Sequence, residues 1–181
     1  GTPQYRHTNA QDVAYNSDGT WFTWSDKANG VTNSWLYDVN GNLTGYQWNQ
    51  KNVNGVETYD YYDAESNLIY SYIEEPDVLG EVQVTRYDPA GNRWVKWDDQ
   101  VTLTLANGGS GWQNAVGKWF YIKNGKPVQS NWKKIDGEWY YFNADGFMVT
   151  GIETEAKKNL AAGDMALDRA YALDGTTGAL I

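Results

Sequence analysis

The chain has 181 residues, of which 41% are hydrophobic, and no stretch reaches the roughly 18 apolar residues that a membrane-spanning helix needs. It has no cysteine and a single histidine, His7, which argues against disulfides, histidine-based catalytic triads and zinc enzymes. The net charge of -9 lies in residues 1–109, with 15 acidic against 6 basic residues, so we expect no nucleic-acid partner. Residues 110–181 hold 8 of each sign.

A short phrase recurs four times in this acidic part, at spacings of 22, 25 and 25 residues. It opens with Tyr, continues with Asp or Asn, and closes with Gly or Ser before Asn or Thr; its copies begin at Tyr15, Tyr37, Tyr62 and Tyr87. The Asp or Asn can accept backbone N–H bonds, and Gly or Asn can adopt the positive φ that closes a hairpin loop. The phrase therefore predicts four β-hairpin turns.

The segments between these turns are β-prone. Residues 31–37 precede one turn, and Leu68, Tyr70 and Tyr72 alternate at period 2 after another. Residues 49–55, 75–80 and 107–111 are rich in Gly, Asn or acidic residues and are interpreted as connections.

The Tyr-Asp-x-x-Gly phrase resembles the YD repeat of large bacterial cell-surface and toxin-shell proteins, over residues 11–100. The resemblance implies hairpins that build a spiralling sheet without catalysis, here a short curved one. We interpret the aromatic residues of this part mainly as packing of an antiparallel meander, since aromatic cross-strand pairs stabilise such sheets.

A second repeat follows, in which residues 111–121 match residues 131–141 at a shift of 20. Both copies carry Trp, then Gly, Trp and Tyr at fixed spacing, and turns are predicted at residues 123–125 and 143–146. Short repeats of this kind indicate stacked hairpins that cannot each bury their own apolar face. Three or four bulky rings on about 20 residues exceed what packing requires, which points to a ligand that binds aromatic faces.

The pattern in residues 110–152 closely resembles the choline-binding repeat, also called the cell-wall-binding repeat, of bacterial murein hydrolases and surface proteins. Relatives of that family bind glucans. A quaternary ammonium has no N–H to donate, so it is recognised by aromatic faces at about 0.5–2 kcal/mol per ring. Three rings would give a dissociation constant of about 1 mM, and binding to a polymer through several pockets would compensate for that weakness.

The resemblance places two Trp of one hairpin and an aromatic residue of the next in each pocket. It implies one complete pocket, from Trp112 and Trp119 with Tyr141, and Met148 nearby. Tyr121 shares a strand face with Trp119 and joins the candidates. A second pocket would use Trp132 and Trp139 with Tyr171. The alternative is that all of these rings simply pack the stack.

The tail departs from the pattern. Residues 153–162 have acids first, lysines later and an apolar stripe at four-residue spacing, which predicts a short helix that ends at Gly163. Residues up to 181 then form a degenerate third copy without Trp, which is more typical of a terminal cap than of a binding unit.

No residue stands out for catalysis, a cofactor or a metal. Residues 38–42 resemble the start of a calcium loop but lack the distal Glu, so turn chemistry is the favoured interpretation. The adjacent pairs Glu74–Glu75 and Asp98–Asp99 would point to opposite strand faces, which suits acid and base roles poorly; a pair brought together by folding stays open.

The sequence therefore predicts an all-β protein: an antiparallel β-hairpin meander at residues 1–109, then a short choline-binding-type hairpin stack, β-solenoid-like, at residues 110–181. We expect a non-catalytic bacterial surface module that binds choline or phosphocholine of cell-wall teichoic acid. The alternatives are a glucan ligand and a purely structural or adhesive role. Residues 1–4 show no leader, so the protein is either cytosolic or, as we expect, secreted with its signal peptide removed. The stack is short, and the acidic hairpins or a homodimer could complete it.

Overall fold

The structure, a computed structural model, describes residues 12–15, 19–25, 28–149, 151–153, 171–173 and 177. The chain divides into two compact units, Gly1–Asp98 and Asp99–Ile181, and each is described by itself below. The sequence predicts the boundary between meander and stack after residue 109. In the structure the second unit begins earlier, at Asp99, and therefore includes strand β9 (Gln100–Thr104).

The described residues are β-strands and turns, with one short 3-10 segment at Ala28–Gly30 and no α-helix. The prediction of an all-β protein built from antiparallel hairpins is therefore confirmed for this part of the chain. The helix expected at residues 153–162 lies outside the described residues, apart from Glu153, which ends strand β15.

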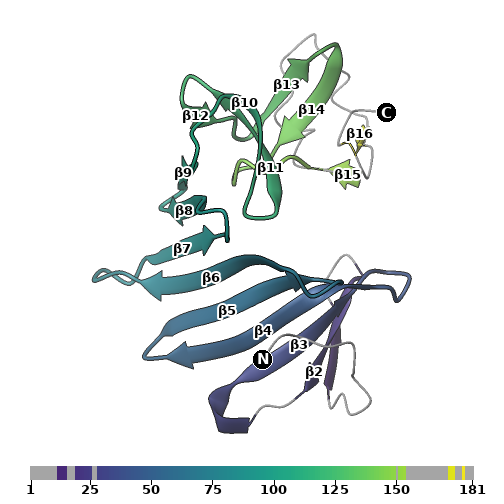
Figure 1. Ribbon diagram of the computed structural model, residues 1–181, viewed down its shortest axis with the longest axis vertical. Helices are drawn as coiled ribbons and strands as arrows, with labels where there is room; N and C mark the ends of the chain where they lie inside the picture. Colours follow the sequence, from purple (N-terminus) through teal and green to yellow (C-terminus); the bar gives the residue numbers. More distant parts are fainter. Residues whose placement is uncertain are drawn as a thin grey trace. The chain divides into compact units, whose positions relative to one another are not determined.

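Eight strands of the first unit follow one another in a single antiparallel sheet, each paired with the next in the chain (Figure 1). They are β1 (Asp12–Tyr15), β2 (Trp21–Ser25), β3 (Thr32–Tyr37), β4 (Leu43–Val53), β5 (Val56–Asp63), β6 (Leu68–Pro76), β7 (Val82–Tyr87) and β8 (Arg93–Trp97). This order is a meander, as the regularly spaced turn phrases predict.

Three of the four predicted turns adopt one geometry. In the turns that begin at Asp38, Asp63 and Asp88, the aspartate Oδ1 accepts the backbone N–H of the Asn four residues later, at 2.9, 2.8 and 2.9 Å. The aspartate N–H donates to the carbonyl of the same Asn, at 2.9 to 3.1 Å. The loop at residues 38–42 is thus a turn, as expected, and the loop after Tyr15 lies outside the described residues.

Two of the expected connections differ from the structure. Strand β6 continues to Pro76, and a fourth turn of the same kind follows, in which Asp77 Oδ1 accepts the N–H groups of Leu79 and Glu81 at 2.7 and 3.0 Å. Residues 49–55 are mostly strand, because β4 runs to Val53 and only Asn54 and Gly55 form the turn. The Asn and Gly content of these segments marked irregular backbone but not its extent.

Aromatic side chains occupy both faces of this sheet. Trp35, Tyr37 and Tyr46 form a buried cluster on one face, with Leu43, Trp48 and Tyr62 packed against it. The other face carries cross-strand tyrosine pairs, with Tyr59 stacked on Tyr72 at a ring distance of 4.4 Å and Tyr61 on Tyr70 at 5.1 Å. These pairs are the cross-strand contacts that stabilise an antiparallel sheet.

The second unit contains the two tryptophan-rich copies as two hairpins of identical register. Trp112 faces Tyr121 and Asn114 faces Trp119 in the first, while Trp132 faces Tyr141 and Lys134 faces Trp139 in the second. The strands of this unit besides β9 are β10 (Gly111–Ala115), β11 (Lys118–Lys123), β12 (Lys126–Pro127), β13 (Asn131–Ile135), β14 (Glu138–Phe142), β15 (Gly151–Glu153) and β16 (Tyr171–Leu173).

Two-residue turns with positive φ at both positions close the hairpins of this unit. They consist of Val116 and Gly117, Asn124 and Gly125, and Asp136 and Gly137. Paired positive φ values match the right-handed twist of the flanking strands, which is why Gly recurs at the second position. The turn predicted at residues 123–125 is confirmed.

Candidate functional site

The first tryptophan-rich hairpin has one buried face and one partly open face. Phe120 and Ile122 are buried, and the Phe120 ring meets the Phe147 ring edge-on at 5.5 Å. Successive side chains of a strand point to opposite faces, so Trp119 and Tyr121 lie on the other side. Trp119 keeps 45% of its surface exposed and can therefore meet a ligand without any rearrangement of the core.

Trp112 is the centre of an aromatic cluster that joins the two hairpins. Its ring lies 6.2 Å from Trp119 and 5.5 Å from Tyr121 within the first hairpin. From the second hairpin, Tyr140 approaches the same ring at 4.9 Å and Phe142 at 5.6 Å. Most of these contacts are edge-on, the geometry that aromatic quadrupoles favour.

The segment that follows β14 contributes Met148 to the same site. The backbone N–H of Met148 donates to the carbonyl of Trp119 at 2.8 Å, which fixes the methionine beside the first hairpin. A cavity of about 370 Å³ lies here, lined by Trp112, Trp119, Tyr140, Met148 and Thr177. None of these lining side chains carries a formal charge. The cavity thus offers three rings, a thioether and one aliphatic hydroxyl.

Three of the residues predicted for the complete pocket, Trp112, Trp119 and Met148, line this cavity. Tyr141 does not; it is fully buried and packs on Trp132 at a ring distance of 5.4 Å. Its neighbour Tyr140 takes the expected place, because it points to the strand face that covers the first hairpin. The period-2 alternation of β14 could have identified Tyr140, had the stacking direction of the hairpins been known.

Three other predicted residues, Tyr121, Trp132 and Trp139, do not line this cavity. Tyr121 already has a cation over its ring, since Lys133 Nζ lies 5.1 Å from its centroid. Trp132 is buried, and Trp139 is half-buried with Lys134 Nζ at 6.0 Å from its ring. The side chain of Tyr171, needed for the second predicted pocket, lies outside the described part of the structure.

Within the described ranges, His, Cys, Asp and Glu side chains form no group of three that could hold a metal ion, and no helix could cross a membrane. The sheet does bring two carboxylates together, because Glu57 on β5 pairs with Glu74 on β6. Gln50 Nε2 donates to Glu57 at 2.7 Å and the Tyr72 hydroxyl donates to Glu74.

In the comparisons with known proteins, a protein-family model matches one part of the chain. A family model described as the choline-binding repeat matches residues 128–160, and no catalytic domain is identified. No curated protein matches the chain. The YD-like interpretation of residues 11–100 receives no support from the comparisons.

Two solved structures are similar to the chain. The first is CbpF in complex with ipratropium, at 20% identity and a TM-score of 0.35, over 83% of this chain and 51% of that one. The second is CbpJ from Streptococcus pneumoniae TIGR4, at 16% identity and a TM-score of 0.34, over 90% of this chain and 65% of that one. The chain spans between half and two thirds of the length of these two proteins. Residues 128–160 of the chain are a choline-binding repeat.

Proposed function

We propose that the second unit binds the quaternary ammonium group of choline or phosphocholine in the cavity lined by Trp112, Trp119, Tyr140 and Met148. The observation that supports this most directly is the combination of three aromatic rings with an uncharged lining. A trimethylammonium group cannot donate a hydrogen bond, so ring faces are its best partners. The choline-binding repeat at residues 128–160 supplies Tyr140 and Met148, and the preceding hairpin supplies both tryptophans.

A single cavity of this kind implies weak binding. Three rings at about 0.5–2 kcal/mol each leave a net free energy near 4 kcal/mol after ordering costs, which corresponds to a dissociation constant of about 1 mM. If several such protein cavities bound the same wall polymer, the avidity would be higher than the affinity of one cavity. We therefore propose a non-catalytic module that acts at a bacterial cell surface, on choline of the wall, and adds one attachment point.

The test is a choline titration followed by tryptophan fluorescence and by the melting temperature. We expect saturation in the millimolar range and a rise in melting temperature, because a ligand that binds only the folded state stabilises it by mass action. The neutral isostere 3,3-dimethyl-1-butanol has the same shape without the charge. It should bind at least about tenfold more weakly if cation–π attraction carries the affinity.

Two adjacent residues of β11 provide matched variants. Trp119→Ala should abolish choline binding and leave the fold intact, since Trp119 is partly exposed at the cavity. Phe120→Ala should destabilise the protein by about 3–5 kcal/mol, since Phe120 is fully buried on the opposite face. Absence of any response at about 50 mM choline would contradict the proposal. Retention of the protein on dextran would then favour a glucan ligand. Unfolding of the Trp119→Ala variant would instead favour the alternative that the aromatic rings only pack the hairpins together.

A further inference from the structure

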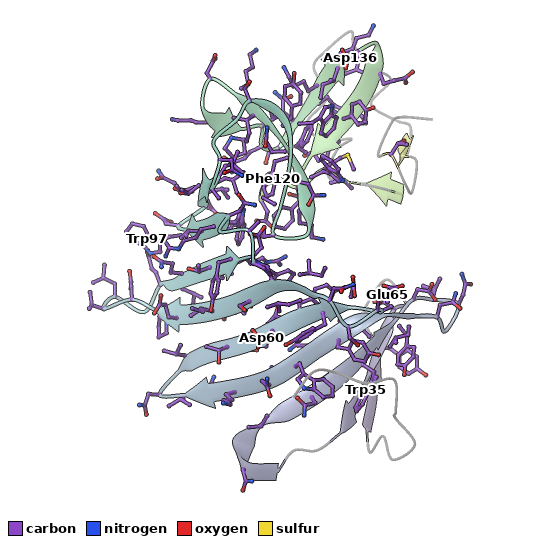
Figure 2. All side chains as sticks on the ribbon, in the orientation of Figure 1. Trp35, Asp60, Glu65, Trp97, Phe120 and Asp136 are labelled. Carbon is purple, nitrogen blue, oxygen red and sulfur yellow. The ribbon has the colours of Figure 1, made fainter. Side chains whose placement is uncertain are left out.

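A second cavity lies within the first unit, on the face of the sheet that carries the buried Trp35 cluster. It has a volume of about 380 Å³, and its lining includes Asn49, Lys51, Thr58, Asp60, Ser71 and Tyr87. These residues come from four consecutive strands, β4 to β7, so the hollow runs across the strands. Asp60 lies in the middle of the sheet, away from its turns (Figure 2).

A β-bulge shapes one wall of this cavity. Trp48 pairs with Asp60 and Lys51 pairs with Thr58, so two residues of β4 oppose only Tyr59 of β5. In a regular strand, residues three apart point to opposite faces; the bulge turns Lys51 to the face of Trp48 and Asp60. Asn49, inside the bulge, has a φ of 55°. Bulges and left-handed residues of this kind cluster at functional sites, where they redirect side chains.

A side chain of the neighbouring strand holds the backbone of the bulge at Asn49. The N–H of Asn49 donates to Asn33 Oδ1 on β3 at 2.9 Å. On the cavity side, the Ser71 hydroxyl donates to Asp60 Oδ1 at 2.6 Å, which orients the carboxylate on the sheet. Because Ser71 holds Oδ1, the position of the second carboxylate oxygen of Asp60 is also set. The site therefore combines an oriented acceptor, the ammonium donor of Lys51 and the amide of Asn49.

We propose that this cavity binds a neutral saccharide. Its charged lining residues, Lys51 and Asp60, balance each other, so neither an anion nor a cation is favoured. Sugar hydroxyls both donate and accept, which matches the carboxylate, the ammonium and the amide of this lining together with the hydroxyls of Thr58, Ser71 and Tyr87. Tyr87, 45% exposed at the edge of the cavity, offers a ring against which the apolar face of a sugar can stack. This site shares no residue with the aromatic cavity of the second unit and does not depend on choline binding.

The experiment is a backbone-amide NMR titration of the full chain with maltotetraose, cellotetraose and N-acetylchitotetraose, each to about 50 mM. Choline and inorganic phosphate serve as charged comparators. We expect saturable shifts for at least one tetrasaccharide, centred on residues 58–60 and 71–73. Asp60→Ala should weaken that binding at least about tenfold, through loss of a charge-assisted hydrogen bond. Lys51→Ala tests the same cavity at an exposed position, in case Asp60→Ala fails to fold.

Two controls separate this proposal from other effects. Glu65→Ala removes an exposed acid in the turn between β5 and β6, outside the cavity, and should leave saccharide affinity unchanged. Trp119→Ala, which tests the choline site, should also leave it unchanged. The proposal is overturned if no tetrasaccharide saturates, if the shifts survive both Asp60→Ala and Lys51→Ala, or if only phosphate or choline shifts these amides.

Discussion

Individual residues decide the shape of the first sheet where its regular pattern breaks. Asn49 has a φ of 55°, and the side chain of Asn33 accepts its displaced N–H. The left-handed region costs most L-residues about 1–2 kcal/mol, and Asn is among the few that visit it readily. The Asn-rich composition of residues 49–55 indicated irregular backbone, but only the pairing with β3 and β5 shows a bulge inside a long strand.

Substitution of Asn49 tests this conformation. Asn49→Val should destabilise the protein by about 1–2 kcal/mol, because a β-branched residue at positive φ is strained. Asn49→Gly should fold with nearly unchanged stability, since glycine adopts positive φ freely. Urea unfolding of both variants measures the difference. Equal stability of the two variants would show that the bulge relaxes into a regular strand.

The recurring element is a five-residue turn organised by one Asp or Asn side chain. It occurs at Asp38, Asp63, Asp77 and Asp88 in the first unit, and Asn143 takes the same role in the second. The Tyr that opens the phrase identified three of these turns. Residues 75–80 are expected only as a connection and not as a turn of this kind, because Pro76 replaces that Tyr and the tip carries Val78 and Leu79. The hydrogen-bonding side chain, rather than the preceding aromatic residue, is therefore the informative signal.

This turn predicts a pH-dependent contribution to stability. The N–H of Asn42 is the largest of the backbone and side-chain donors that lower the pKa of Asp38 below its ordinary value of 3.8. A lowered folded-state pKa gives stability that is present above pH 3.8 and lost as the pH falls through the folded value. Asp38→Asn should keep the turn, as Asn143 does, and should lose less stability on acidification than the parent chain.

Urea midpoints of the two proteins at neutral pH and at about pH 2.5 give the comparison. An identical acid-induced loss in both would exclude Asp38 as a contributor. Asp38→Ala serves as the control that removes the acceptor altogether and should be less stable at both pH values.

On the scale of the whole molecule, the two compact units arrange their aromatic residues differently. The first spreads them over both faces of a meander, while the second concentrates them between two hairpins. Burial raises the pKa of Tyr59, Tyr61 and Tyr72 in the first unit, and the hydrogen bond to Glu74 raises that of Tyr72 further. A raised pKa of this kind gives stability that is complete below pH 10 and declines as the pH rises beyond it.

We therefore expect the chain to be less stable at about pH 11 than at about pH 8, with the loss beginning near pH 10, because the unfolded state then releases tyrosine protons that the folded state retains. Urea unfolding monitored by circular dichroism measures this loss. Tyr72→Phe removes one of the responsible hydroxyls and should show a smaller loss over the same range. A loss as large as that of the parent chain would assign the alkaline effect to other groups.

The resemblance to the choline-binding repeat implied Trp112, Trp119 and Met148 as residues of one pocket. The sequence by itself determined the all-β class, most of the hairpin turns and the two tryptophan-rich copies. These features depend on local chemistry: turn residues, strand alternation and a fixed repeat spacing. Only the tertiary structure decided that Tyr140, rather than Tyr141, faces the cavity, because that choice depends on which face of one hairpin stacks on the other. The cavity beside Asp60 was beyond sequence reasoning for the same reason, since a bulge defined by two neighbouring strands turns Lys51 toward it.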